Sequence, residues 1–281
     1  MLFTTASKLS ENLKNFRSST KKIGFAPTMG ALHSGHMSLI TQAHQQTEVV
    51  VVSIFVNPTQ FNNSSDLEKY PRNLEKDINY INENYPNTLI FAPAIEEMYT
   101  RGCQSESFDF GELEKVMEGA FRPGHFNGVG TIVKRLFEVV QPDIAFFGEK
   151  DFQQLAVVRR LVEITKLPVK IVGCETEREP NGLAKSSRNE RLSETAREEA
   201  KVIFESLSKL KFAFNDKSPR ELKDMFETEL ESNTKFELEY IQIADEETLQ
   251  PVEEFEKEKK YRAFTAVIVE EVRLIDNIAL N

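Results

Sequence analysis

Residues 23–36 read IGFAPTMGALHSGH, and this stretch decides the fold that the rest of the chain follows. The run at 22–26 is largely apolar and is typical of a β-strand. Directly after the stretch, Met37, Ile40 and Ala43 recur at helical spacing and predict a helix over 35–46. A strand therefore turns into a helix across a segment that holds two glycines and two histidines.

This turn has the chemistry of a phosphate site. The first turn of a helix has backbone N–H groups without partners and the positive end of the helix dipole, so it receives anions readily. Gly30 and Gly35 let the backbone approach a ligand closely. His33 and His36 lie three residues apart, so both imidazole rings can face one bound group.

Other interpretations of the same residues stay open. A glycine-containing turn between a strand and a helix is often purely structural. Two histidines at this spacing can also bind zinc, although no third cysteine or histidine ligand lies nearby. His44 shares the apolar side of the predicted helix with Met37 and Ile40, so we expect it to be packed rather than to bind a ligand.

Length, composition and charge restrict the class of protein. The chain has 281 residues, enough for two domains or one large one, and its formal net charge is −10. An acidic chain without a long basic run argues against nucleic acid as the main partner. Its two cysteines have no metal-binding spacing, and no apolar stretch approaches the roughly 18 residues of a membrane helix. We therefore expect a cytoplasmic protein without a membrane partner.

The first half of the chain alternates between helix and strand patterns. After a leading helix over 5–18 and the opening strand and helix, the run 48–56 is rich in β-branched residues and is typical of a buried parallel strand. Leu74, Ile78 and Ile81 indicate a helix, and 88–93 indicates another strand. This order predicts an α/β fold with right-handed crossovers, and the polar loop 57–62 follows the second strand at the edge where such sheets bind ligands.

The middle of the chain continues this alternation. We expect a helix over 111–120, a loop over 121–128 that is a candidate for movement, and a helix over 129–140. His125 in that loop is equally compatible with packing and with substrate contact. The strand 144–147, the charged turn 148–151, the helix 152–166 and the strand 169–173 follow. Lys150 in the charged turn suits either a phosphate or a solvated helix start.

The last third of the chain changes character. The polar stretch 175–191 contains Arg178, Lys185, Arg188 and Arg191, which favours phosphate recognition over a plain linker. Helical patterns over 193–213 and 218–231 then precede strands at 236–243, 261–269 and 272–280, which predicts a small α+β domain. The acidic stretch 246–260 is expected to be a solvated face. We therefore divide the chain into a domain over 1–175 and a smaller domain over 176–281.

Six blocks of sequence resemble one family. They are PTMGALHSGH at 27–36, VNPTQF at 56–61 with YPR at 70–72, RPGHFNGV at 122–129, FGEKDFQQ at 147–154 and GLAKSSRN at 182–189. In this order and spacing they are similar to pantothenate synthetases (pantoate–β-alanine ligases), within the wider HxGH nucleotidylyltransferase superfamily. The likeness covers nearly the whole chain. Without a Walker A or GxGxxG pattern, P-loop kinases and nicotinamide dehydrogenases are disfavoured.

The resemblance implies a fold, a reaction and partners. The fold is a Rossmann-like doubly wound parallel sheet that binds nucleotide and pantoate, with a smaller C-terminal α+β domain that covers the active site, usually in a homodimer. The reaction is the ATP- and Mg²⁺-dependent condensation of (R)-pantoate with β-alanine to pantothenate, through a pantoyl adenylate, with release of AMP and pyrophosphate. From charge and composition, we expect no nucleic-acid or membrane partner.

The resemblance also implies roles for individual residues. Catalysis is assigned to His36, His33, Lys150, Ser186, Ser187 and Arg188. Nucleotide binding is assigned to Met29, Gly30, Ala31, Leu32, His33, Ser34, Gly35, His36, Gly148, Glu149, Lys150, Asp151, Glu177, Lys185, Ser186, Ser187 and Arg188. Pantoate binding is assigned to Gln60, Gln154 and Asn57, because a neutral amide pairs with a hydroxyl and a carboxylate without repelling the acid. Gln60 is also a candidate contact of β-alanine. Asp77 and Asp151 are the candidates for orienting an ATP-bound magnesium ion.

Two departures from the family pattern are visible. Lys185 stands where many relatives have an apolar residue, and the segment 62–65, Asn-Asn-Ser-Ser, replaces a loop richer in glycine. Two other functions remain as alternatives to the ligase. A simple nucleotidylyltransferase acting on a phosphate ester would need no amine, and a non-catalytic nucleotide-binding module would bind without turnover.

Overall fold

The computed structural model of this protein describes residues 1–231 and 235–281. The chain divides into two compact units. Unit 1 comprises 1–110, 122–149 and 154–175, and unit 2 comprises 111–121, 150–153 and 176–281. We predicted a single boundary after residue 175, whereas two short segments that precede it are counted with unit 2.

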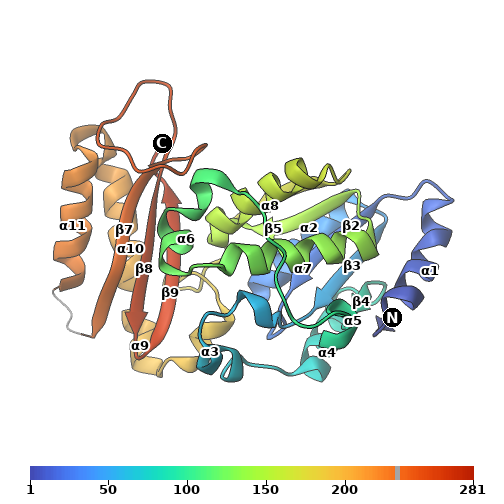
Figure 1. Cartoon of the computed structure of the whole chain (residues 1–281). Helices are drawn as coiled ribbons and strands as arrows, with labels where there is room; N and C mark the ends of the chain where they lie inside the picture. The colour runs from blue at the N-terminus through green and yellow to red at the C-terminus, as the bar shows by residue number, and fades with distance from the viewer. Residues whose placement is uncertain (232–234) are drawn as a thin grey trace. The chain divides into compact units, whose positions relative to one another are not determined.

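Unit 1 is built on a six-stranded parallel sheet (Figure 1). The strands lie in the order β1-β4-β3-β2-β5-β6, and β2 pairs with β3 on one side and with β5 on the other. Their bounds are β1 Leu2–Phe3, β2 Ile23–Thr28, β3 Val49–Ile54, β4 Leu89–Phe91, β5 Ile144–Gly148 and β6 Lys170–Cys174. The predicted doubly wound parallel sheet is confirmed.

Helices cover both faces of this sheet because successive strand residues point to opposite sides. Ala26, Val52 and Phe146 share one core cluster with Ile40 of α2 and Ile81 of α4. On the other face, the Phe25 ring meets that of Phe137 in α7 edge to face at 6.1 Å. The helices of this unit and the short segments between them are α1 Ala6–Arg17, α2 Ser34–Gln46, η1 Pro58–Gln60, α3 Ser64–Glu68, α4 Leu74–Asn84, α5 Ile95–Met98, α7 His125–Val140 and, from Gln154 on, α8 Phe152–Thr165. The segment η3 Glu149–Asp151 and the first two residues of α8 include 150–153, which are counted with unit 2.

The order of the strands places a switch point between β2 and β5. From β2 the chain moves outward through β3 to β4, and it then returns to place β5 and β6 on the other side of β2. Ligands of doubly wound sheets bind at the carboxyl ends of strands at such a point. The histidine turn follows β2 there, and Gly148 ends β5 beside it in the sheet order.

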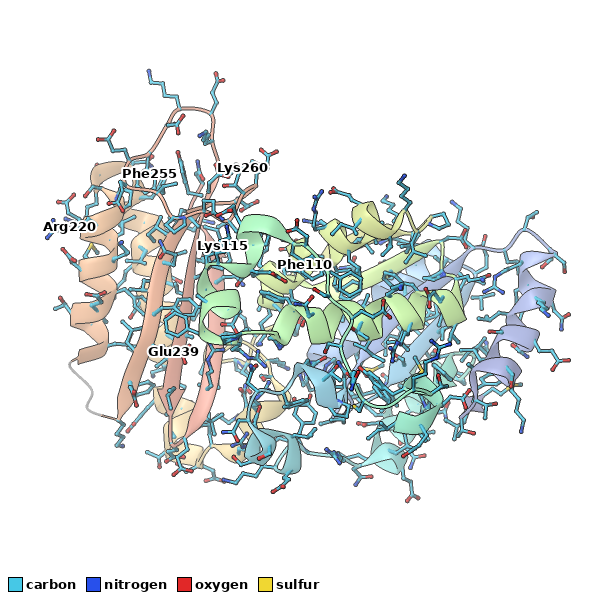
Figure 2. All side chains as sticks on the ribbon, viewed as in Figure 1. Phe110, Lys115, Arg220, Glu239, Phe255 and Lys260 are labelled. Atoms are coloured by element: carbon cyan, nitrogen blue, oxygen red, sulfur yellow. The ribbon has the colours of Figure 1, made fainter. Side chains whose placement is uncertain are left out.

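Unit 2 contains a three-stranded antiparallel sheet in the order β7-β8-β9, with strands β7 Phe236–Asp245, β8 Tyr261–Val269 and β9 Val272–Ala279 (Figure 1). Leu207 of α10 and Phe226 of α11 form a core with the sheet residues Ile243 and Val267. At the edge of this core, Phe255 (labelled in Figure 2) packs on Tyr261 with ring centroids 4.7 Å apart. The remaining segments are η2 Gly111–Glu114, α6 Met117–Phe121, η4 Ser187–Arg191, α9 Glu194–Glu199, α10 Lys201–Ala213, η5 Phe214–Asp216 and α11 Pro219–Glu231.

The middle of the chain differs most from the prediction. The helix expected over 111–120 is a 3₁₀ turn followed by the short helix α6, because Met117 at the start of α6 has a φ of +44° and interrupts a continuous helix. Helix α7 begins at His125 rather than at 129, so the predicted loop is shorter. Gly124 makes this early start possible, since its φ is +79°.

The predictions from sequence patterns also differ from the structure at several short elements. The pattern over 193–213 is divided into α9 and α10 at Ala200. Strand β1 and the short helices α3 and α5 were not expected, because elements of two to five residues contain too few positions to show a period. None of the helices within 1–231 and 235–281 is long and apolar enough to cross a membrane.

Candidate active site

The two histidines of the turn cap the helix that follows them. His33 is the N-cap residue of α2, and its Nδ1 accepts a hydrogen bond of 3.1 Å from the backbone N–H of Gly35. In return, Nδ1 of His36 accepts one of 3.3 Å from the N–H of His33. The two rings lie with their centroids 4.1 Å apart. This reciprocal arrangement is a capping box in which imidazoles replace the usual serine and glutamate.

The capping bonds decide which ring nitrogen carries the proton. A backbone N–H can only donate, so Nδ1 of each ring must be the acceptor. The proton of the neutral imidazole is therefore on Nε2 in both His33 and His36. Each ring thus has an N–H donor on its edge away from the helix backbone, which suits an anionic oxygen.

His44, at the other end of the same helix, is packed as expected. Its ring stacks on Tyr85 with centroids 4.4 Å apart, and Nε2 is 2.8 Å from Oγ1 of Thr88. Burial lowers the pKa of His44 below its ordinary value. This histidine therefore supports the packing of α2.

Asn57 and Gln60, predicted to bind pantoate, form one buried amide network after β3. Nδ2 of Asn57 donates to Oε1 of Gln60 and to the carbonyl of Gly128, at 3.1 Å in both cases. Oδ1 of Asn57 accepts from the hydroxyls of Thr59 and Tyr99. A Cβ on Gly128 would lie 2.3 Å from the carbonyl oxygen of Thr59, so only glycine lets α7 pack so closely on η1.

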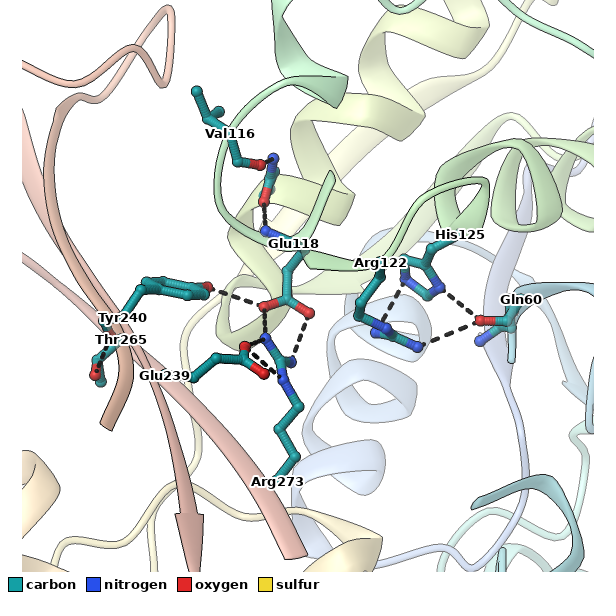
Figure 3. Close-up of polar contacts among 10 residues, drawn as sticks. Gln60, Val116, Glu118, Arg122, His125, Glu239, Tyr240, Thr265 and Arg273 are labelled. Atoms are coloured by element: carbon teal, nitrogen blue, oxygen red, sulfur yellow. Dashed lines mark hydrogen bonds and ion pairs between the residues drawn. The ribbon is translucent and has the colours of Figure 1, made fainter. Parts of the chain in front are cut away.

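His125 supports this network from the start of α7 (Figure 3). Its Nδ1 lies 2.7 Å from the backbone carbonyl of Gln60, and its Nε2 lies 3.3 Å from a guanidinium nitrogen of Arg122. The carbonyl only accepts and the guanidinium only donates, so the imidazole is neutral with its proton on Nδ1. The ring of His125 therefore holds the backbone of Gln60.

Two adjacent glutamines of α8 have different surroundings. Gln153 is buried; its side chain accepts from the N–H of Glu118 at 2.9 Å and donates to the carbonyls of Leu113 and Val116 at 2.8 Å each. Gln154 is half-buried, and within the described part of the chain its amide makes no hydrogen bond. The amide of Gln154 is thus the one of the pair that can still bind a ligand.

Lys150 and Asp151 are held by the sheet of unit 2. The carbonyl of Lys150 accepts a hydrogen bond of 2.9 Å from Nδ2 of Asn277 in β9, whose Oδ1 accepts one of 2.6 Å from Arg262 in β8. The guanidinium of Arg262 also packs over the ring of Phe152 at 4.0 Å. The ammonium of Lys150 lies 3.5 Å from the carboxylate of Asp151. The backbone is therefore fixed, and the cation stays on a flexible stem.

The serine–arginine segment lies on a short hairpin in unit 2. Arg178 and Ala184 form an antiparallel bridge, and the N–H of Lys185 donates to the carbonyl of Glu177 at 2.9 Å. Ser186 then caps η4, because its Oγ accepts from the N–H of Arg188 at 3.3 Å. The hairpin therefore fixes the backbone around Ser187 and Arg188.

Arg178 is one cation of this stretch that the structure assigns to the fold. Its guanidinium makes two hydrogen bonds with the carboxylate of Asp276, at 2.6 and 3.0 Å, and packs over the ring of Phe204 at 3.7 Å. A buried, bidentate ion pair is costly to break. The structure therefore explains Arg178 by its ion pair with Asp276, and phosphate recognition by the stretch 175–191 stays a prediction for its other cations.

Sequence reasoning missed a buried cluster around Glu118 in unit 2 (Figure 3). The carboxylate of Glu118 makes two bonds of 2.7 Å with the guanidinium of Arg273 and accepts one of 2.9 Å from the hydroxyl of Tyr240. Glu239 pairs with the same guanidinium. A β-bulge between Leu238 and Tyr240 lets Glu239 and Tyr240 reach one cluster although they are neighbours in β7.

The cluster perturbs the ionisation of its members. Burial and the negative charge of Glu118 raise the pKa of Tyr240 well above its ordinary value. Burial alone would lower the pKa of Arg273, but its bonds to Glu118 and Glu239 raise it instead. Tyr240 and Arg273 therefore keep their protons across the neutral range, and the hydrogen bonds of the cluster hold Glu118 of α6.

The predicted site residues thus fall into two groups. Unit 1 holds the imidazoles of His33 and His36 and the amides of Asn57, Gln60 and Gln154, and unit 2 holds the cations and hydroxyls, namely Lys150, Lys185, Ser186, Ser187 and Arg188. Among the residues that the structure describes, no group of three or more His, Cys, Asp or Glu is arranged to hold a metal ion. A Rossmann-like sheet with an HxGH turn at its switch point defines a nucleotide-binding enzyme of the nucleotidylyltransferase type.

Comparison with known proteins narrows this class. A family model described as pantoate-beta-alanine ligase matches residues 1–279, and the chain belongs to this family. A pantothenate synthetase from Christiangramia forsetii is 52% identical over all of this chain and 99% of its own length. The crystal structure of pantothenate synthetase from Thermus thermophilus has a TM-score of 0.92 at 41% identity, with 99% of each chain covered.

A third relative was solved with ligands. The pantoate-beta-alanine ligase from Francisella tularensis, crystallised with a β,γ-ATP compound and β-alanine, has a TM-score of 0.83 at 35% identity and covers all of this chain and 97% of its own. Because the likeness extends over complete chains, the family assignment applies to both units.

Proposed function

We propose that this protein condenses (R)-pantoate with β-alanine in two steps, using ATP. The carboxylate of pantoate attacks the α-phosphorus of ATP to give pantoyl adenylate and pyrophosphate. The amine of β-alanine then attacks the acyl carbon, forms the amide bond of pantothenate and releases AMP. The observation that carries this proposal is the imidazole capping box at the switch point of the sheet, in a chain of the pantoate-beta-alanine ligase family.

The first step brings two anions together, so charge stabilisation matters more than proton transfer. In-line displacement places negative charge on the equatorial oxygens and on the leaving pyrophosphate. The Nε2–H groups of His33 and His36 are donors whose orientation is set before ATP binds, because the capping bonds hold both rings. Lys150 and Arg188 supply positive charge, and Ser186 and Ser187 supply hydroxyl donors to the phosphates.

Pantoate binding is assigned to the neutral amides of unit 1. Gln60 is held by Asn57 through its side chain and by His125 through its carbonyl. Gln154 has its whole amide available, so it offers two donors and one acceptor to a carboxylate and a hydroxyl. Support for this role comes from the contrast with Gln153, whose amide is fully used inside the fold.

The second step needs protection from water, since an acyl adenylate hydrolyses readily. That the smaller domain, with the segment 121–129, provides this cover stays a prediction. Homodimer formation also remains a proposal, which rests on the family resemblance, and a cytoplasmic location remains a proposal that rests on composition and cysteine spacing.

Magnesium is proposed as part of the ATP complex. Mg²⁺ usually keeps several waters and binds through substrate phosphates plus one or two carboxylates, and the side chain of Asp151, beside Lys150, suits such a role. When bound, the ion would neutralise charge on the phosphates. The residues present therefore fit a phosphate-bound ion better than a cage made by the protein alone.

The decisive experiment is pantoate-dependent exchange between ATP and labelled pyrophosphate, with and without β-alanine. The proposal expects exchange that requires pantoate but no amine, and AMP as the nucleotide product of the full reaction. Release of ADP and inorganic phosphate would replace adenylation by an acyl-phosphate mechanism. Exchange without pantoate, or ATP binding without turnover, would favour the simple nucleotidylyltransferase or the binding module.

A further inference from the structure

Asp77 contacts the turn between β2 and α2 from a distant part of the sequence. It lies in the first turn of α4, its side chain is buried, and the residue is 2% exposed. Oδ2 accepts a hydrogen bond of 3.0 Å from the N–H of Ala31, and Oδ1 accepts one of 2.7 Å from the N–H of Leu32. Both oxygens of the carboxylate are therefore directed at two consecutive backbone donors of the turn.

The backbone conformation of the turn explains why it needs such a partner. Gly30 and Ala31 both have positive φ, at +83° and +50°. Successive residues in unusual conformations direct their N–H groups into one concavity, which attracts an anion. A Cβ on Gly30 would lie 3.0 Å from Oδ2 of Asp77, so the carboxylate sits directly against this part of the turn.

The neighbouring N–H groups also have acceptors inside the chain. That of Gly30 donates to Oγ1 of Thr28 at 3.3 Å, and that of His33 donates to Nδ1 of His36 at 3.3 Å. All four consecutive N–H groups from Gly30 to His33 are therefore used within unit 1. In a P-loop, by contrast, such groups cradle the phosphates themselves.

We propose that Asp77 is a positioning residue of the nucleotide site: its carboxylate fills the anion site of the turn and holds the turn in the shape that presents His33 and His36. This assignment rests on the proposed function, and it gives Asp77 a role different from the magnesium contact that we expected from the sequence. ATP is then bound by side chains around the turn. The N–H groups of Ala31 and Leu32 keep their hydrogen bonds to Asp77 when the nucleotide binds.

The test compares Asp77→Asn with Asp143→Asn. The amide of an asparagine can accept only one of the two N–H bonds, and its NH₂ group faces the other donor. Asp143 is a matched control, because its Oδ2 accepts a bond of 2.7 Å from the N–H of Ile23 at the opposite end of the same strand β2. Both variants thus lose a bond between a carboxylate and the backbone, but only one loses it at the turn.

The kinetic readout is pyrophosphate exchange at varied ATP, pantoate and Mg²⁺. For Asp77→Asn we expect kcat/KM for ATP to fall about 10- to 100-fold, the loss associated with a buried, charge-assisted hydrogen bond. KM for pantoate and the Mg²⁺ concentration for half-maximal rate should stay within about threefold of the wild-type values. A threefold change corresponds to less than the 1.4 kcal/mol of a tenfold change. Asp143→Asn should keep all three values. A higher Mg²⁺ requirement, with activity restored by excess Mg²⁺, would make Asp77 a metal contact and overturn the proposal.

A second readout needs neither a variant nor activity. In the wild-type protein without nucleotide, the amides of Ala31 and Leu32, selectively labelled with ¹⁵N, should already be protected from hydrogen exchange. They should shift little when ATP is added. Unprotected amides, or large shifts on ATP addition, would mean that the phosphates take these donors and would refute the proposal. Failure of the ligase proposal would instead be seen as absent pantoate-dependent exchange in the wild type, with the amide protection unchanged.

Discussion

Replacing His36 by alanine separates the catalytic role of this imidazole from its structural one. The ring takes part in the capping box, in which its Nδ1 accepts from the N–H of His33 at 3.3 Å. Losing a helix cap of this kind costs about 1 kcal/mol of the free energy of unfolding. The same substitution removes the Nε2–H donor, and one preorganised donor to a developing negative charge is worth about 10²- to 10³-fold in turnover.

The loss of stability and the loss of turnover in His36→Ala differ enough in size to be told apart. A protein with an unfolding free energy of about 5–15 kcal/mol stays almost entirely folded after a loss of about 1 kcal/mol. A loss of turnover of about 10²-fold in His36→Ala therefore cannot come from unfolded molecules. We expect kcat and kcat/KM to fall together, because the donor acts on charge that develops in the transition state.

The assay is pantoate-dependent pyrophosphate exchange together with the rate of pantothenate formation, and urea unfolding measures stability on the same samples. His44→Ala is the control, because His44 lies on the same helix but stacks on Tyr85 away from the turn. We expect it to lose stability and to keep its turnover. Near-wild-type turnover in His36→Ala, or equal losses in both variants, would refute the role of His36.

Three further predictions follow from other parts of the structure. Gln154→Glu should raise KM for pantoate by about tenfold or more while KM for ATP changes little in steady-state kinetics. The reason is that two carboxylates about 4 Å apart near a surface repel by up to about 4 kcal/mol. Equal changes in the two KM values would mean that Gln154 is wrongly assigned to pantoate. Arg273→Met should lower the unfolding free energy by on the order of 3 kcal/mol, since it leaves Glu118 uncompensated; urea unfolding should show partial recovery when Glu118→Gln is added, and no recovery would refute the pairing. Burial and the charge of Glu149 raise the pKa of Cys174 from 9.0 to about 11, so the native state keeps this thiol protonated where the unfolded state ionises. Stability should therefore fall as pH rises from 9 towards 11, less steeply in Cys174→Ala, and an aromatic disulfide at pH 8 should modify Cys174 only after unfolding; rapid modification of the folded protein would contradict this.

The amino-acid sequence by itself determined the elements that depend on local pattern. The alternation of apolar runs and helical periods predicted β2, α2 and β3 within one or two residues and established the parallel sheet. The turn at 27–36 and five other blocks were sufficient to indicate the family, because the residues of each block are contiguous in the chain. Local patterns also failed at some positions. The helix predicted over 111–120 is interrupted at Met117 by its positive φ, which the periodicity of apolar residues does not show.

Only the tertiary structure decided which of the candidate side chains are committed to the fold. Gln153 and Gln154 are adjacent and identical in type, yet one binds the backbone of 113–118 and the other keeps its amide available. Arg178 is occupied by Asp276, which lies 98 residues further along the chain, and the carboxylate of Asp77 meets a turn more than 40 residues before it. Hydrogen bonds and ion pairs between such distant positions form only when the chain folds, so no local pattern records them.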